Sequence, residues 1–140
     1  MKKREAVSKI MTHNLVKLNV NDSLSKAESL FKKNKVKHLP VVKGNHIVGM
    51  LSYSDLLRIS FADATDDSGN YIESTVYDMF SLEQVMTHKV VCVESDDDIR
   101  DVAEILSKKH FHALPVIEHD KLIGIVTSTD IINFFLEQYN

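Results

Sequence analysis

The sequence has one cysteine, no hydrophobic run long enough to cross a membrane, and no excess of positive charge. Because Cys92 stands alone, no intramolecular disulfide can form, and this composition fits a reducing compartment. A net charge of -3 provides no basic field that would attract a nucleic-acid backbone. The basic residues 2–4 could open a signal peptide, but Glu5 and Lys9 interrupt any apolar segment after them. We therefore expect a cytoplasmic protein that binds neither nucleic acid nor membranes.

What the sequence does contain is typical of a folded domain. Its 140 residues, 44% hydrophobic and 26% charged, suffice for one compact domain or for two half-domains that share a core. Val91 and Val93 flank Cys92, so we expect this thiol to be a small packed group on a strand rather than a reactive one.

The main feature of the chain is an internal repeat. Four motifs occur twice: Met11-Thr12-His13 and Met86-Thr87-His88, Leu39-Pro40-Val41 and Leu114-Pro115-Val116, Gly49 and Gly124, and Asp55 and Asp130. Every pair is 75 positions apart (86 − 11, 115 − 40, 124 − 49 and 130 − 55), so no gap is needed to align the two copies. Two copies at constant spacing predict one structural unit formed twice.

Hydrophobic periodicity predicts the same elements in both copies. In the first copy it predicts a strand over 15–20, a helix after N-cap candidates at 21–23, a hairpin of strands 36–42 and 47–51, and a helix over 53–61. In the second copy the strands are 90–93, 111–117 and 122–126, and a helix starts at the acidic run 96–98. We attribute these acidic residues to the helix dipole rather than to a metal site. The last helix is unusually apolar over 131–136.

Between the copies, residues 62–70 are polar and predict a loop, and residues 71–86 predict a linker helix whose shorter counterpart is 6–11. The predicted boundaries are 1–61 for the first repeat, 62–81 for the linker, and 82–140 for the second repeat. The fold class is mixed α/β. We expect two pseudo-symmetric β-α-β-β-α repeats packed sheet to sheet, because a three-stranded sheet cannot bury both faces alone.

Over residues 5–138 the sequence resembles the paired CBS domain, also called a Bateman module. The resemblance rests on the Met-Thr start, the Leu-Pro-Val strand, and the Gly-apolar-apolar-Ser/Thr-x-x-Asp end of each copy. It implies a regulatory module that binds adenosine-containing ligands, such as AMP, ADP, ATP or S-adenosylmethionine, in two clefts between the copies. It also implies a homodimer and an effector protein that the sequence does not identify. No cofactor is expected to be required.

The Ser/Thr-x-x-Asp motif has two physical interpretations. Thr127 and Asp130 lie one helical turn apart, so they can form a capping box that satisfies backbone N–H groups. They can also serve a ligand, because helix N–H groups attract phosphate and a carboxylate can accept hydrogen bonds from both ribose hydroxyls. Within the family resemblance we favour ligand binding.

The resemblance carries two sets of site residues over to this chain. The first cleft would contain Thr12, Val16, Val36, Lys37, His38, Thr127, Thr129 and Asp130. The second cleft would contain Ser52, Ser54, Asp55, Thr87, Val91, Phe111, His112 and Ala113. We favour the first because Thr127 matches the family pattern better than Ser52, and because Tyr53 and Phe111 could crowd the second.

Other chemistry has weaker support. No arginine lies inside either motif, so histidines near the strand ends are the candidate phosphate partners, which predicts a pH-sensitive affinity. His110, His112 and His119 lack a further ligand at structural-zinc spacing, and we expect no metal. No catalytic arrangement emerges, so we expect no enzyme. The alternative to a nucleotide sensor is a structural or dimerisation module without a physiological small ligand, for which the apolar segment 131–136 argues.

Overall fold

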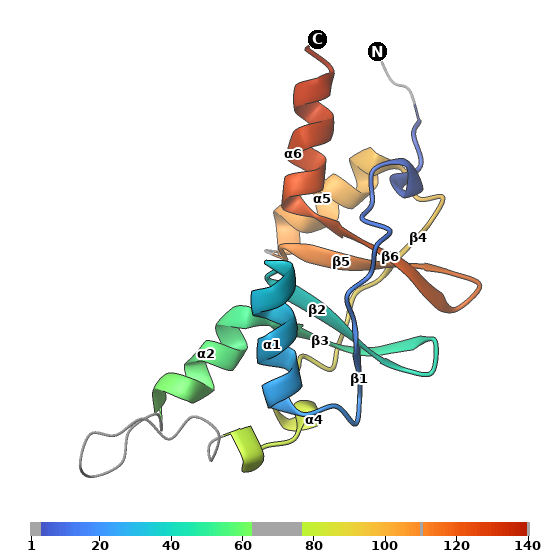
Figure 1. Ribbon diagram of the computed structural model, residues 1–140. Coiled ribbons are helices and arrows are strands. Elements are labelled where there is room, and N and C mark those ends of the chain that lie inside the picture. The colour runs from blue at the N-terminus through green and yellow to red at the C-terminus, as the bar shows by residue number, and fades with distance from the viewer. Residues whose placement is uncertain (1–3, 63–76, 110, 140) are drawn as a thin grey trace. The chain divides into compact units, whose positions relative to one another are not determined.

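The computed structural model describes residues 4–62, 77–109 and 111–139. The chain forms two compact units (Figure 1). One is continuous and spans Val16–Lys89, and the other combines Met1–Leu15 with Val90–Asn140. Each unit contains a three-stranded sheet and its own hydrophobic core, so the mixed α/β class predicted from the sequence is confirmed.

The unit Val16–Lys89 contains the first copy of the β-α-β-β-α string. Its elements are β1 (Leu18–Asn19), α1 (Leu24–Asn34), β2 (His38–Lys43), β3 (His46–Ser52), α2 (Tyr53–Ala62) and α4 (Leu82–Val85). The sheet has the order β1-β2-β3, with β1 parallel to β2 and β2 antiparallel to β3. The predicted helical stripe is confirmed, because Leu24, Ala27 and Phe31 of α1 are buried in the core of this unit.

The second unit contains the same β-α-β-β-α string, preceded by a short 3₁₀ helix from the N-terminal segment of the chain. Its elements are η1 (Val7–Lys9), β4 (Val93–Glu94), α5 (Ile99–Lys109), β5 (Ala113–Glu118), β6 (Lys121–Thr127) and α6 (Ser128–Glu137). The sheet order β4-β5-β6 repeats that of the first unit, with one parallel and one antiparallel pair. The stripe predicted for α5 is also confirmed, since Val102 and Leu106 lie in the core of this unit.

The repeat extends to details of the backbone. The hairpin of β2 and β3 shifts register between Val41 and Val42, and the hairpin of β5 and β6 shifts between Val116 and Ile117, at the equivalent positions. The tight turn predicted before β3 contains Gly44 with a φ of 66°, a left-handed conformation that glycine adopts without steric cost. The same offset that relates the motifs therefore relates the irregularities of the sheets.

Two predictions from periodicity were wrong in extent. The strands predicted over 15–20 and 90–93 are only two residues long, because β1 pairs with β2 only at Leu18 and Asn19, and β4 is confined to Val93–Glu94. The linker helix predicted over 71–86 is not continuous across its described part. Ser81 starts a new helix there, because its hydroxyl accepts from Gln84 N–H and the Gln84 side chain accepts from Ser81 N–H in a capping box. Residues 63–76, including most of the predicted loop, lie outside the described residues.

The Met-Thr segment that precedes each copy packs on the core of the other copy. Thr12 N–H donates to the Ile125 carbonyl oxygen (2.8 Å) and Ile125 N–H donates to that of Thr12 (3.1 Å), which extends the β4-β5-β6 sheet at β6. Thr87 and Met50 exchange the equivalent pair of bonds beside β3 (2.8 and 3.0 Å). In Figure 1 the blue N-terminal segment accordingly lies beside β6. Neighbours in sequence are thus divided between the two units.

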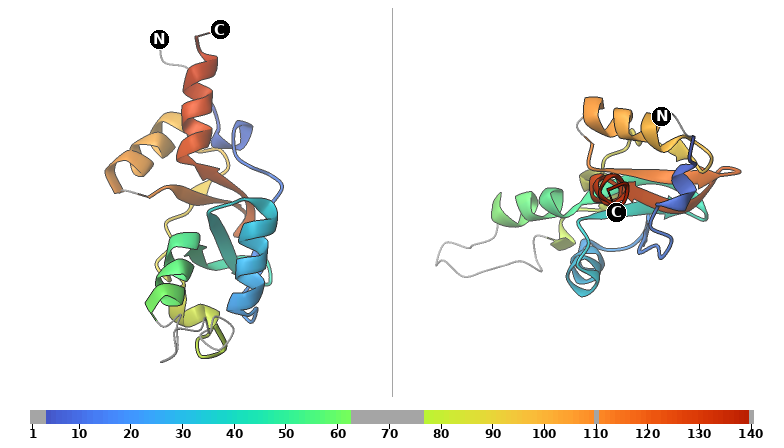
Figure 2. Two further views of the ribbon diagram at one scale, coloured as in Figure 1. Left: turned by 60° about the vertical axis from the view of Figure 1, so that its left-hand side comes forward. Right: turned by 90° about the horizontal axis from the view of Figure 1, so that it is seen from above.

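The last helix leaves part of its apolar surface uncovered. The C-terminal half of α6 extends past the β4-β5-β6 sheet of its own unit (Figure 2). Ile132, Phe135, Leu136 and Tyr139 are 55%, 56%, 56% and 74% exposed. The apolar character predicted for 131–136 therefore exceeds what this helix buries.

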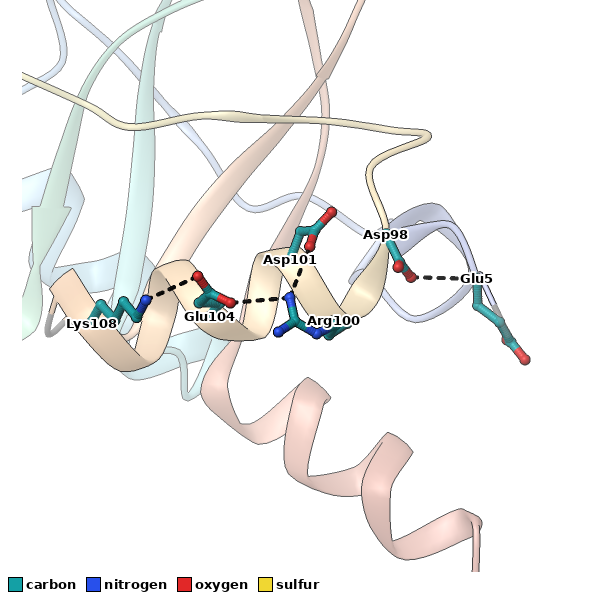
Figure 3. Close-up of polar contacts among 6 residues, drawn as sticks. All are labelled: Glu5, Asp98, Arg100, Asp101, Glu104 and Lys108. Carbon is teal, nitrogen blue, oxygen red and sulfur yellow. Dashed lines mark hydrogen bonds and ion pairs between the residues drawn. The ribbon is translucent and has the colours of Figure 1, made fainter. Parts of the chain in front are cut away.

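The outer face of α5 carries a ladder of ion pairs (Figure 3). Arg100 lies 3.3 Å from Asp101 and 3.1 Å from Glu104, and Lys108 lies 3.1 Å from Glu104. The hydrogen bond from Lys108, followed by the charges of Lys108 and Arg100, lowers the pKa of Glu104 below its usual value.

Replacing Glu104 with glutamine is expected to destabilise the protein slightly at pH 7, because exposed ion pairs contribute little. A carboxyl with a lowered folded pKa contributes stability above its unfolded pKa, and this contribution is lost as the pH falls through the folded pKa. The difference between wild type and Glu104→Gln should therefore shrink as the pH falls below the ordinary glutamate pKa of about 4.3 and through the lowered pKa of folded Glu104. Urea unfolding at several pH values measures this difference. A difference that stays constant from pH 7 to pH 3 would contradict the assignment.

Candidate functional site

The junction between β6 and α6 forms the capping box that the sequence motif allows. Thr127 is the N-cap residue, and its hydroxyl accepts a hydrogen bond from Asp130 N–H (3.1 Å). In return, Asp130 Oδ2 accepts from Thr127 N–H (2.9 Å). These two bonds fix the Asp130 carboxylate at the first turn of α6, beside the end of β6.

Capping uses only half of the Asp130 carboxylate. Among the described residues, Oδ1 of Asp130 accepts no hydrogen bond and makes no ion pair, and the side chain is only half-buried. An ionised carboxylate oxygen can accept more than one hydrogen bond. The two interpretations of the motif are therefore compatible, because one oxygen can cap the helix while the other remains available to a ligand hydroxyl.

The junction between β3 and α2 has one of these two hydrogen bonds and one additional contact. Asp55 N–H donates to the Ser52 hydroxyl oxygen (3.1 Å), as Asp130 N–H does to that of Thr127. The Asp55 carboxylate, however, pairs with Arg58 on the next turn, with Oδ1 3.2 Å from NH1. The two junctions thus share a backbone design and differ in the charge beside the aspartate.

The start of the middle strand lies next to each junction. In one unit His38 pairs with Ser52, and Tyr53 N–H donates to the Lys37 carbonyl oxygen (2.9 Å). In the other unit Ala113 pairs with Thr127, and Ser128 N–H donates to the His112 carbonyl oxygen (3.0 Å). Lys37, His38, His112 and Ala113 are all predicted site residues. The structure places Lys37 and His38 beside the junction of one unit, and His112 and Ala113 beside the junction of the other.

The remaining predicted site residues fall into two groups. Thr12 and Thr87 are exposed. Thr12 pairs with Ile125 of β6 and Thr87 pairs with Met50 of β3, and each of these strand residues lies two positions before the junction residue, Thr127 or Ser52. Ser54 and Thr129 are exposed in the first turns of α2 and α6. The apolar members contact the cores or solvent: Val16 and Val36 pack on one core, Phe111 packs on the other, and Val91 is exposed.

Within each unit the structure therefore gathers about half of each predicted cleft. Thr12, Thr127, Thr129 and Asp130 lie together in one unit, and Val16, Val36, Lys37 and His38 belong to the other. The same division applies to Ser52, Ser54, Asp55 and Thr87 and to Val91, Phe111, His112 and Ala113. The combination of these halves into two clefts stays a prediction.

Two side chains add contacts that the sequence did not indicate. The Tyr53 ring lies against Phe31 of its own unit, with centroids 5.1 Å apart, and its expected crowding of the second cleft stays a prediction. Arg58 was not considered because it lies outside the motif, yet it contacts the motif aspartate. The available signal was its position three residues after Asp55, which places both side chains on one face of a helix.

The structure also bears on the thiol, on metal ligands and on membrane-spanning helices. Burial, followed by the charge of Glu94, raises the pKa of the Cys92 thiol, so this group is protonated at neutral pH and a poor nucleophile. Among the described residues, no three His, Cys, Asp or Glu side chains gather to hold a metal ion, and His110 lies outside them. No helix in the described part of the chain is long and apolar enough to cross a membrane.

The chain belongs to the CBS domain family. A match to this family covers residues 7–62 and again residues 82–137, so the chain contains two CBS domains in tandem. The repeated β-α-β-β-α string and the two hydroxyl–aspartate junctions fall inside these matches. The resemblance noted in the sequence is therefore confirmed as family membership.

Two relatives are similar to nearly the whole of this chain and are much longer than it. The chain is 32% identical over 135 residues to the protein MJ1404 of Methanocaldococcus jannaschii, covering 94% of this chain and 32% of that protein. It is 32% identical over 127 residues to a homoserine O-acetyltransferase of Methanohalobium evestigatum, covering 89% of this chain and 23% of the enzyme. The chain thus spans about a third or less of these two relatives, and the acetyltransferase name refers to a much longer protein.

Solved structures share the whole fold. CBSX2, solved in complex with AMP, is 26% identical, with a TM-score of 0.79, and the match covers 96% of this chain and 98% of CBSX2. The CBS domain pair of protein MJ0100, solved with 5′-methylthioadenosine and S-adenosyl-L-methionine, is 25% identical, with a TM-score of 0.76 and coverage of 94% and 99%. Both matches cover nearly the whole of the two chains compared.

Proposed function

We propose that this chain is a regulatory module that binds an adenosine-containing ligand and acts on a partner protein. The observation that carries this proposal is the repeated junction at which a hydroxyl accepts from the N–H of an aspartate in the first turn of a helix, while that aspartate retains acceptor capacity for a ligand. The likeness of the whole chain to CBS domain pairs solved with AMP and with S-adenosylmethionine supports an adenosine ligand.

The junction chemistry suits the ribose of a nucleoside. Oδ1 of Asp130 can accept hydrogen bonds from the two neighbouring ribose hydroxyls, which a protonated or neutral side chain would hold less well. In the first turn of α6, a helix of ten residues, Ser128 N–H and Asp130 N–H donate to the His112 carbonyl oxygen and the Thr127 hydroxyl, and the positive end of the helix dipole adds to this environment. These groups bind and orient a nucleoside, and we assign the module no catalytic role.

Regulation requires that the ligand prefers one state of the module. A ligand shifts a conformational equilibrium only by the difference between its affinities for the two states. Binding of the ligand at a junction would then change the affinity for the partner protein by a certain factor, and binding of the partner would change the affinity for the ligand by the same factor. The effector protein and the cytoplasmic location expected from the sequence stay predictions.

The test is thermal unfolding of the wild type and of an Asp55→Ala, Asp130→Ala double variant with AMP, ATP and S-adenosylmethionine. At a hundredfold excess over its dissociation constant, a ligand that binds only the native state stabilises it by about 2.7 kcal/mol. This raises the midpoint by on the order of several degrees. We expect at least one ligand to shift the wild type and none to shift the double variant, provided that the variant still unfolds cooperatively. Absence of any shift in the wild type would reject the proposal.

A second candidate is an interaction module without a small ligand. The exposed side chains Ile132, Phe135 and Leu136 on α6 favour it, because contiguous apolar surface often marks a protein contact. The homodimer predicted from the sequence fits this candidate and the first one equally. The same unfolding experiment separates them, because only the first predicts stabilisation by an adenosine ligand.

A further inference from the structure

The two junctions share the hydrogen bond from the aspartate N–H to the hydroxyl oxygen and have opposite net charge. Ser52 and Asp55 occupy the positions of Thr127 and Asp130, 75 residues apart, and the capping bonds agree to within 0.1 Å (3.1 and 3.1 Å). The residue three positions after the aspartate is Arg58 in one copy and Asn133 in the other. The residue whose carbonyl oxygen receives the helix N–H is Lys37 in one copy and His112 in the other.

These two differences lie beside the first turn of the helix at each junction. The 2.9 Å bond from Tyr53 N–H to the Lys37 carbonyl oxygen places Lys37 at the start of α2, and Lys37 is exposed. Arg58 lies one turn along α2, exposed, with NH1 on the Asp55 carboxylate. With histidine neutral, two cations and one carboxylate flank the α2 junction, whereas one carboxylate alone flanks the α6 junction.

Charge near Lys37 extends further along the chain. Lys32 and Lys33 lie in the last turn of α1, and Lys35 follows as its C-cap, so four lysines fall within the six residues that lead into β2, of which Lys32 pairs with Glu28 (3.7 Å). The equivalent lysine of α5, Lys108, is held by Glu104 in the ladder of Figure 3. Residues 32–37, which lead into β2, therefore carry more positive charge than residues 107–112, which lead into β5.

We propose that the two junctions select different ligand classes: the Asp55 junction takes a phosphorylated adenosine, and the Asp130 junction takes an adenosine derivative without a phosphate. This inference rests on the proposed function and assigns its ligands. Arg58 neutralises Asp55 with one nitrogen and retains further N–H donors, which suit phosphate oxygens. At the other junction no cation among the described residues pairs with Asp130, so its carboxylate repels a phosphate and leaves the ribose contact intact.

The experiment measures adenosine and AMP affinities by calorimetry with one junction disabled at a time. The Asp130→Ala variant retains only the Asp55 junction, and the Asp55→Ala variant retains only the Asp130 junction. One net charge about 5 Å from a phosphate in water changes affinity about fourfold, and Arg58 neutralises Asp55, so the remaining charge of Lys37 predicts that Asp130→Ala binds AMP about fourfold more tightly than adenosine. Asp55→Ala should bind adenosine at least as tightly as AMP. Thermal unfolding of each variant checks that it is folded.

Exchanging the distinguishing residue between copies provides the matched control. Arg58→Asn in the Asp130→Ala background should reduce the AMP preference severalfold without weakening adenosine, and Asn133→Arg in the Asp55→Ala background should create a preference for AMP. The preference should also shrink when the salt concentration is raised, since exposed charges are screened. An equal AMP-to-adenosine ratio in both single-junction variants overturns this inference and leaves the proposed function standing. Absence of binding by either compound to the wild type overturns both.

Discussion

Deletion of residues 1–12 is expected to unfold the unit that contains residues 90–139 while residues 16–62 remain folded. Val7 and Met11 are 0% and 7% exposed in the core of that unit, although they precede the other copy in sequence. Burial of one valine and one methionine side chain contributes about 3 to 6 kcal/mol together, a large part of the 5 to 15 kcal/mol of a typical domain. The deletion also removes backbone hydrogen bonds from Val7 to Asp97 and between Thr12 and Ile125.

Amide hydrogen exchange measures this effect element by element. Protection should fall in β5 and β6 and persist in β2 and β3. Two point variants provide a matched comparison, since Met11 and Met86 occupy equivalent positions on opposite cores. Met11→Ala should loosen β5 and β6, and Met86→Ala should loosen β2 and β3. Equal loss of protection in both sheets would show that the segments do not belong to separate cores.

Elements dominated by local pattern could be predicted from the sequence. The buried stripes of α1 and α5 follow helical spacing, and Ser23 caps α1 through a hydrogen bond from Lys26 N–H. The constant offset between copies predicted even the repeated hairpin. Strand ends were less predictable because a strand ends where its partner no longer pairs with it, and β1 has partners only at Val41 and Val42.

Long-range choices could not be predicted in the same way. Residues 6–11 are apolar at helical spacing whichever core they join, so no local signal assigns Val7 to the second copy. The linker helix was wrong for a related reason: Tyr77, Leu82 and Met86 are buried in a core, which imitates the periodicity of a single helix, while the Ser81 cap interrupts it.

The candidate site shows both outcomes. The hydroxyl and aspartate positions could be predicted because the Ser/Thr-x-x-Asp spacing by itself brings a side chain to the first-turn backbone. The contact between Arg58 and Asp55 depends on the side-chain conformations of two exposed residues, which no spacing determines uniquely. It is nevertheless this contact that distinguishes the two junctions.

Replacement of Gly124 with alanine is expected to destabilise the Asp130-containing unit by about 1 to 3 kcal/mol, the usual range for overpacking a core. A Cβ atom at this position would lie 2.5 Å from Met11 Sδ, 3.0 Å from Met11 Cγ and 3.1 Å from the Thr12 carbonyl oxygen. The glycine therefore lets the Met-Thr segment approach β6 closely enough to form the Thr12–Ile125 pair. Urea unfolding of Gly124→Ala against wild type measures the loss.

A double-mutant cycle with Met11→Ala tests the cause. Because most of the close contacts are to the methionine side chain, Gly124→Ala should cost less in the Met11→Ala background, with a coupling of about 0.5 to 3 kcal/mol. Gly49 and Met86 form the matched pair in the other unit, where the three nearest atoms all belong to the methionine side chain. Relief by Met86→Ala should therefore be more complete for Gly49→Ala than relief by Met11→Ala is for Gly124→Ala, since the Thr12 carbonyl oxygen remains in place. Strictly additive effects at both pairs would contradict this account, because they would show that the methionines do not pack on the glycines.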